Sequence, residues 1–281
     1  MTGHAGAGHS RNYFTALFGL VLASFKQLVG PPSDSGRSEA ARKLRRLIFW
    51  LAVIGGSAVI VLMYAVDATE IRLMPPRGSP ALWPIRILTD FGKASYVLWT
   101  LAAMLIVIAL FSPGLRGHAR SRLLAWGTQL AFVFFSVLTP VLAGEVVKWM
   151  VGRGRPFVGG EASVFTFSHF ARTEAYASFP SAHAITGFAL AFAVSAVWPR
   201  ARLAMSGYAV LIAVSRLVLL AHHPSDVVAG ALIGVAGAML VRYWFAARDL
   251  GFAISRDGTI VALAGTSPVR LKGVAREASA P

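Results

Sequence analysis

A histidine and an aspartate in the last third of the chain have the types and spacing of a nucleophile and its orienting partner. His222 and Asp226 lie four residues apart at the predicted start of a helix, so helical geometry lets their side chains approach one another. A carboxylate that accepts a hydrogen bond from one imidazole nitrogen fixes the tautomer and leaves the other nitrogen free to attack. Structural pairs of this kind are common, so this pair alone is weak evidence for catalysis.

A second histidine stands where an anion could bind. His183 follows Pro180 and Ser181 at the start of another apolar run. Proline suits the first turn of a helix, and the free N–H groups and positive dipole end of a helix N-terminus favour an anion. His183 would project from this first turn into the same space. Taken alone, an ordinary helix start with a surface histidine is the better explanation.

Three cations accompany these groups. Lys148 and Arg155 follow the end of an apolar run, and Arg216 precedes His222 by six residues. Ionisable groups at a membrane edge are candidate functional residues. The alternative is that Lys148 and Arg155 are membrane-edge anchors whose charges reach lipid headgroups. Position alone does not separate the two explanations.

The elements that must position these residues are predicted membrane spans. Hydrophobic residues make up 56% of the 281 residues and charged residues only 14%, whereas a soluble domain carries roughly a quarter charged residues. A helix needs about 20 apolar residues to cross the hydrocarbon core. Six runs meet this pattern, at about 47–66, 96–112, 123–146, 182–198, 203–221 and 226–246. We therefore predict an all-α, polytopic membrane protein with a six-helix transmembrane bundle.

The chain divides into three predicted parts. Residues 1–43 form a cytoplasmic N-terminal segment, residues 44–247 the six-helix membrane domain, and residues 248–281 a cytoplasmic tail with at most one short hairpin. Within the first part, residues 13–29 are apolar but contain Lys26. This pattern favours an amphipathic helix on the membrane surface, and the alternative is the core of a signal peptide.

Flanking charge predicts the orientation. Basic residues gather in the gaps before the first span, between the second and third, and between the fourth and fifth: Arg37, Arg42, Lys43, Arg45 and Arg46; Arg116, Arg120 and Arg122; and Arg200 and Arg202. By the positive-inside rule these segments are cytoplasmic. The loops 67–95, 147–181 and 222–225 then face the periplasm, and both termini lie in the cytoplasm. The expected location is a bacterial inner membrane, with every residue named above as a site candidate at the outer face.

The net charge of +15 is compatible with binding to anionic lipid or a phosphorylated substrate. Nucleic acid is the weakest candidate partner, because the basic residues form no continuous stripe with interleaved aromatics. The chain contains no cysteine, which excludes disulfides, thiolate metal sites and thiol catalysis.

Combined, the polar groups form a pattern with defined internal spacing. They read Lys148-x6-Arg155-Pro156, then Pro180-Ser181-Ala182-His183, then Ser215-Arg216-x5-His222-x3-Asp226. This resembles the three-part signature of the type 2 phosphatidic acid phosphatase superfamily, in the same order and on the same membrane face. The resemblance covers about residues 95–246, and Ala182 departs from it, because the family most often has glycine there.

The resemblance implies a role for each matching residue. The phosphate oxygens would be held by Lys148, Arg155, Ser181 and Arg216. His222 would attack phosphorus in line, Asp226 would orient it, and His183 would protonate the leaving group. The cations would replace the metal ion of many phosphoryl-transfer enzymes, so neither a metal nor another cofactor is implied.

Neighbouring polar residues receive other predictions. Arg153 matches no family position and is expected to face headgroups, and His223 lies one residue away from the family spacing. Glu145 is expected to be a structural partner of Lys148 or Arg155. The remaining outer carboxylates are scattered along the sequence and receive no role: Asp67, Glu70, Asp90, Glu161 and Glu174.

The predicted function is hydrolysis of a lipid phosphate monoester or lipid diphosphate at the periplasmic face, through a phosphohistidine and without metal. The alternative is a protein that binds or transports a phospholipid or polyprenyl phosphate without cleaving it. A related soluble haloperoxidase is a third class, and the apolar spans argue against it. Undecaprenyl diphosphate, phosphatidylglycerophosphate, phosphatidic acid and lipid A phosphate all fit, because the motifs read the phosphate and not the lipid.

Overall fold

The computed structural model describes residues 13–32, 36–156, 158 and 164–263. Its helices are α1 (Tyr13–Val29), α2 (Arg37–Ala65), α3 (Asp67–Leu73), α4 (Trp83–Asp90), α5 (Ala94–Phe111), α6 (Gly117–Val151), α7 (Ala182–Val197), α8 (Arg202–Val218) and α9 (Pro224–Ala246). Short 3-10 helices are η1 (Pro80–Leu82), η2 (Ser112–Gly114), η3 (Glu174–Tyr176) and η4 (Pro199–Ala201). Strands β1 (Phe252–Ile254) and β2 (Ile260–Ala262) form an antiparallel hairpin.

Five helical segments in the described part of the chain are long and apolar enough to cross a membrane. They are Arg37–Ala65, Pro80–Gly114, Gly117–Val151, Pro199–Val218 and Pro224–Ala246. The sixth predicted span corresponds to α7, which is apolar but has only 16 residues and rises about 24 Å. The prediction of an all-α membrane bundle is confirmed, and the count of six spans is approximate because α7 is short.

Helix α7 lies at the centre of the bundle, in contact with α6, α8 and α9. Small residues let α9 approach it closely. A Cβ atom added at Gly230 would lie 2.5 Å from the carbonyl oxygen of Ser181, and one at Gly234 would lie 2.5 Å from that of Ile185. Close backbone contact of this kind stabilises helix pairs in membranes, because the hydrophobic effect contributes little to helix association in lipid. It also brings the starts of α7 and α9 together.

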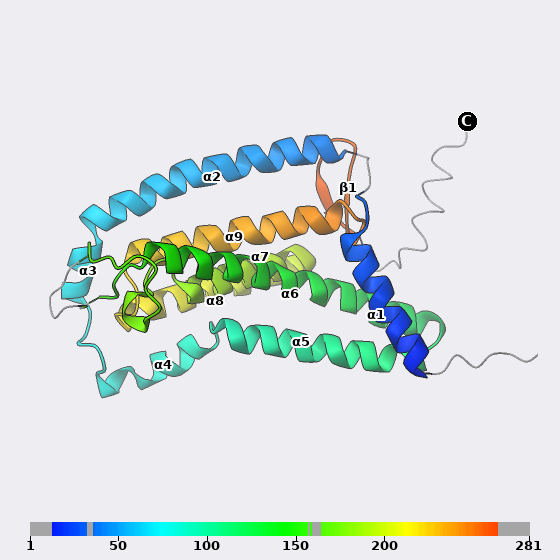
Figure 1. Ribbon diagram of the computed structural model, residues 1–281, viewed down its shortest axis with the longest axis horizontal. Helices are drawn as coiled ribbons and strands as arrows, with labels where there is room; N and C mark the ends of the chain where they lie inside the picture. The colour runs from blue at the N-terminus through cyan, green and yellow to red at the C-terminus, as the bar shows by residue number, and fades with distance from the viewer. Residues whose placement is uncertain (1–12, 33–35, 157, 159–163, 264–281) are drawn as a thin grey trace, which may run out of the picture.

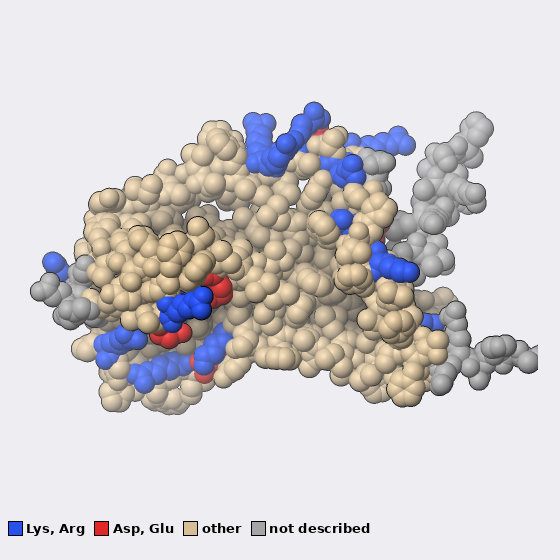
Figure 2. Space-filling model, viewed as in Figure 1, with Lys and Arg blue, Asp and Glu red and all other residues tan. Residues whose placement is uncertain are grey.

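The two ends of the bundle differ (Figure 1). At one end lie α3, α4 and the loop that joins α6 to α7, and at the other lie α1 and the hairpin. Helix α1 runs across the ends of the long helices (Figure 1), and hydrogen bonds hold it at both of its own ends. The Tyr13 hydroxyl donates to Leu110 O at 2.6 Å, and Trp244 Nε1 donates to Leu28 O at 3.1 Å. Figure 2 shows charged side chains of this face at the α3 and α4 end, along the first part of α2 and near α1, with an almost uncharged surface between these groups.

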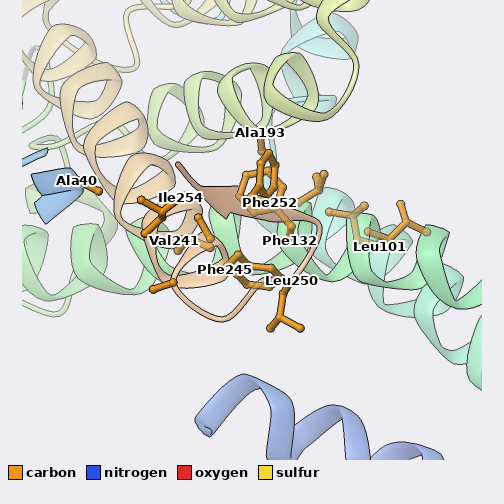
Figure 3. Close-up of a cluster of buried hydrophobic side chains, with 13 residues drawn as sticks. Ala40, Leu101, Phe132, Ala193, Val241, Phe245, Leu250, Phe252 and Ile254 are labelled. Carbon is orange, nitrogen blue, oxygen red and sulfur yellow. The ribbon is translucent and has the colours of Figure 1, made fainter. Parts of the chain in front are cut away.

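The hairpin is part of a hydrophobic cluster at the α1 end (Figure 3). The Phe132 ring of α6 lies 5.5 Å from the Phe245 ring of α9 and 4.7 Å from the Phe252 ring of β1, measured between centroids. Leu250 and Ile254 belong to the same cluster. The first part of the predicted tail is therefore packed on the bundle, and residues 264–281 lie outside the described residues.

Candidate active site

The predicted site residues lie at the end of the bundle opposite α1. Lys148 is in the last turn of α6, Arg155 follows that helix, and Arg216 is in the last turn of α8. Ser181 caps α7 at its start, and its backbone N–H donates to Asp226 O in the first turn of α9 at 3.0 Å. This hydrogen bond joins the second and third sequence motifs directly.

His222 is buried in the turn between α8 and α9, with 3% of its surface exposed. Its Nδ1 lies 2.7 Å from the carbonyl oxygen of Ser178 and 4.0 Å from Asp226 Oδ2. Because a carbonyl oxygen only accepts, Nδ1 carries the proton and Nε2 carries the lone pair. The sequence placed Asp226 next to His222, and the structure shows that the hydrogen-bond partner is the Ser178 backbone.

Asp226 has other partners, which explains this difference. Its Oδ1 accepts from Arg153 Nη1 at 2.7 Å. Its Oδ2 accepts from the Ser178 hydroxyl at 2.6 Å and from the backbone N–H of His223 at 2.9 Å. The carboxylate therefore caps α9 and fixes Ser178, and Ser178 in turn contacts His222.

Arg153 is the main residue that sequence reasoning missed, and the prediction that it faces headgroups is wrong. Only 1% of its surface is exposed. Its guanidinium donates to Val164 O, to the Ser225 hydroxyl at 2.6 Å and to Asp67 Oδ2 at 2.8 Å, as well as to Asp226. Asp67 belongs to α3 and is fully buried. No local signal in the sequence marks Asp67, which precedes Arg153 by 86 residues.

Helix α4 supplies a second missed contact. Thr89 is buried and its hydroxyl accepts from Arg216 Nη1 at 2.9 Å and from the Ser215 hydroxyl at 3.0 Å. Close by, a Cβ atom added at Gly92 would lie 3.2 Å from His183 Cδ2. The junction of α4 and α5 therefore forms a wall of the site beside Arg216 and His183.

Two predicted phosphate-binding cations have acidic partners in this structure. Arg155 Nη2 lies 2.8 Å from Glu174 Oε2, and the Glu174 side chain is 90% exposed. Lys148 forms an ion pair with Glu145 one turn earlier on α6, the structural contact that its spacing predicted. Both acidic partners are open to solvent, so such pairs contribute little stability and exchange readily.

Three polar nitrogens of the site lie buried without a hydrogen-bond partner in the described part of the chain. They are Arg155 Nε, Arg216 Nε and His183 Nε2. Buried polar groups are almost always hydrogen-bonded in folded proteins, and an orphaned donor costs free energy. Three such atoms on residues of all three motifs indicate a site for a ligand rich in acceptor oxygens.

The surroundings of His222 favour its neutral form. Burial, together with the positive charges of Arg216 and Arg155, lowers the pKa of His222 well below its usual range. The imidazole is therefore neutral at neutral pH, and Nε2 keeps its lone pair.

A carboxyl group in α3 is shifted in the opposite direction. Burial and the nearby charges of Asp67 and Asp226 raise the pKa of Glu70 to about 7.

The chain is similar to known membrane phosphatases. The sequence pattern of the PAP2 superfamily matches residues 129–250. A lipid A 1-phosphatase from Rhizobium johnstonii is 32% identical over 213 residues, covering 72% of this chain and 82% of that protein. A lipid A 1-phosphatase from Rhizobium etli is 31% identical over 179 residues, covering 61% of this chain and 75% of that protein.

Two further proteins resemble it more distantly. The bacitracin transport permease protein BcrC of Bacillus licheniformis is 27% identical over 173 residues, covering 57% of this chain and 78% of that protein. A crystal structure of a PAP2-type phosphatidylglycerolphosphate phosphatase from Bacillus subtilis is 20% identical, covers 71% of this chain and 92% of that chain, and gives a TM-score of 0.46.

The helical bundle and these relatives define a multi-pass inner-membrane enzyme of the lipid phosphatase class. The chain belongs to the PAP2 superfamily. The family resemblance read from the three motifs is thereby confirmed.

Glu70 provides a test of the electrostatics around the site. Both of its carboxylate oxygens are buried without a partner among the described residues, and its raised pKa means that the folded state holds the proton more tightly than the unfolded chain does. Stability should therefore fall as pH rises from about 4.5 through about 7. Glu70→Gln, which mimics the protonated acid, should unfold at a higher temperature than the wild type in detergent, and the difference should grow between pH 5 and pH 8.

The matched control is Glu174→Gln, which removes an exposed carboxylate. Its difference from the wild type should change little over the same pH range. A Glu70→Gln difference that is constant with pH would show that Glu70 is ionised in the folded protein.

Proposed function

We propose that this protein hydrolyses a lipid phosphate monoester or lipid diphosphate through a phosphohistidine formed at His222, at the periplasmic face and without a metal ion. The observation that carries the proposal is the set of orphaned buried nitrogens on Arg155, Arg216 and His183. A phosphate group has the acceptor oxygens to satisfy them, and the neutral His222 supplies the nucleophile that mere binding does not need.

In the first step, the substrate phosphate replaces Glu174 as the partner of Arg155 and also contacts Arg216, Lys148 and Ser181. His222 Nε2 attacks phosphorus in line, and the bond from phosphorus to the leaving oxygen breaks. His183 gives that oxygen a proton. The Nδ1–H bond to Ser178 O stabilises the positive charge that the imidazole gains.

In the second step, water attacks the phosphohistidine. His183, now unprotonated, accepts a proton from the water, and the bond between phosphorus and His222 Nε2 breaks. Inorganic phosphate leaves, and both histidines return to their starting states. The cations supply the charge stabilisation throughout, as metal ions do in other phosphoryl-transfer enzymes.

For the substrate, we propose the 1-phosphate of lipid A, because two relatives at 31% and 32% identity carry the name lipid A 1-phosphatase. Purified protein should release phosphate faster from lipid A than from undecaprenyl diphosphate, phosphatidylglycerophosphate or phosphatidic acid. Release from none of these lipids would favour the alternative, a protein that binds or transports a phosphorylated lipid without cleaving it.

Variants of the two adjacent histidines test which of them is the nucleophile. His222→Ala should abolish phosphate release by several orders of magnitude, because a covalent nucleophile is lost. His223→Ala is the matched control and should keep substantial activity, since the proposal gives the His223 ring no step. Acid-quenched turnover with radiolabelled substrate should place the label on His222, and label on His223 or on a serine would reject the assignment.

The absence of a metal requirement is tested with a chelator. Because Lys148, Arg155 and Arg216 supply the positive charge, activity should survive EDTA with less than about a twofold loss, measured as phosphate release. Inactivation by EDTA that added Mg²⁺ restores would contradict this part of the mechanism.

Orientation can be tested by labelling, because the chain has no native cysteine. The charge pattern places the loop between α6 and α7 outside; Ser163, a natural choice there, lies outside the described residues. Thr173 is exposed in the same loop, and Ser121 is exposed near the start of α6 at the other end. Thr173→Cys should react with an impermeant thiol reagent in intact spheroplasts, and Ser121→Cys only after lysis. The reverse pattern would invert the topology.

A further inference from the structure

We propose that Arg153 and Asp67 are positioning residues of the hydrolysis reaction, which hold the nucleophile His222 in line through Asp226 and Ser178. The inference rests on the proposed function, because it gives these residues a task only if His222 attacks phosphorus. Neither residue belongs to the three motifs, and both would act at a distance from the substrate.

The contacts form a continuous path of short hydrogen bonds. Arg153 Nη1 donates to Asp226 Oδ1 at 2.7 Å, and Asp226 Oδ2 accepts from the Ser178 hydroxyl at 2.6 Å. The carbonyl oxygen of the same serine lies 2.7 Å from His222 Nδ1. Every group on this path is buried.

Ser178 is fixed from two sides. Its hydroxyl is bound to Asp226, and its backbone N–H donates to the carbonyl oxygen of Arg153 at 3.0 Å. The peptide group that holds the imidazole is therefore aligned by both the side chain and the backbone of the segment around Arg153. A carbonyl oxygen aligned in this way fixes both the tautomer and the ring plane of His222.

Asp67 fixes the other side of the guanidinium. Its Oδ2 accepts from Arg153 Nη2 at 2.8 Å and also from the Ser225 hydroxyl, and its Oδ1 accepts from the Ser225 backbone N–H at 3.1 Å. Ser225 precedes Asp226 in the first turn of α9. Asp67 therefore holds both Arg153 and the helix turn that carries Asp226, and it ties them to α3.

Geometry explains why arginine is needed here. All three nitrogens of the guanidinium donate, in different directions, to Val164 O, Asp67, Ser225 and Asp226. A lysine keeps the charge, but its donors radiate from a single atom and cannot span both carboxylates in this planar arrangement. A small displacement of a catalytic group can lower the rate about 100-fold.

The decisive variant is therefore Arg153→Lys, made in the chain of 281 residues and assayed with lipid A. We expect kcat to fall by about 100-fold, while KM and the inhibition constant of inorganic phosphate change by less than about threefold. Lys148, Arg155 and Arg216 remain in place and should bind phosphate as before. The rate of phosphohistidine formation in a single turnover should fall with kcat, because the attack itself is misaligned.

A purely structural role gives a different result. Arg153→Lys would then lower the unfolding temperature and the yield, but the folded fraction would turn over at the wild-type kcat. That outcome would overturn the proposal. Arg172→Lys, at an exposed arginine of the same loop region, is the matched control and should leave kcat, KM and unfolding temperature unchanged.

Two milder variants decide the matter if Arg153→Lys does not fold. Asp67→Asn keeps the size of the side chain but removes its charge, and Ser178→Ala removes only the hydroxyl that contacts Asp226. Each should lower kcat at nearly constant KM, and their double variant should lose less than the product of the single losses, because both act through Asp226. Unchanged kcat in both single variants would reject the path.

The experiments distinguish failure of this inference from failure of the proposed function. If His222→Ala is inactive and Arg153→Lys retains full kcat, the nucleophile assignment stands and the positioning inference fails. If His222→Ala retains activity or the label maps elsewhere, the proposed function itself fails.

Discussion

The end of the bundle that carries the candidate site depends on one buried guanidinium between two buried carboxylates. Arg153 contacts Asp67 and Asp226, and these three side chains are at most 1% exposed. Removing one partner from such a cluster leaves an uncompensated buried charge and typically costs about 3 to 5 kcal/mol. The segments that meet here are α3, the loop around Arg153 and the start of α9, and a small buried cluster of Ile71, Val164 and Leu220 supplies the apolar contact beside them.

Close helix packing brings that cluster to the candidate site residues. Gly230 and Gly234 let α9 approach α7 at backbone distance, so the starts of the two helices lie side by side. The Ser181 N–H bond to Asp226 O follows from this approach. A side chain at Gly230 would push against the Ser181 carbonyl, so the geometry of the site and the packing of the membrane bundle share one constraint.

The opposite end of the molecule has a different composition. There α1 lies across the helix ends, and the hairpin packs its aromatic residue Phe252 on α6 and α9. The basic residues of α2 and of the start of α6 belong to this end as well. The basic segments from which the orientation is predicted therefore lie at the end opposite the candidate site, as the predicted topology expects.

The sequence by itself located the long apolar helices and predicted the candidate site residues, because apolar runs and short motifs are encoded locally. It did not predict α3 and α4, which lie within the predicted loop 67–95. Apolar runs located the spans, although α2 and α6 extend beyond the predicted 47–66 and 123–146, since hydropathy marks only the part in hydrocarbon and helical hydrogen bonds continue into the headgroup layer. Only the tertiary structure decided how His222 is held. Its partner is a backbone carbonyl, which has no residue signature, and Asp67, Arg153 and Thr89 reach the site from distant segments through contacts that no short spacing encodes.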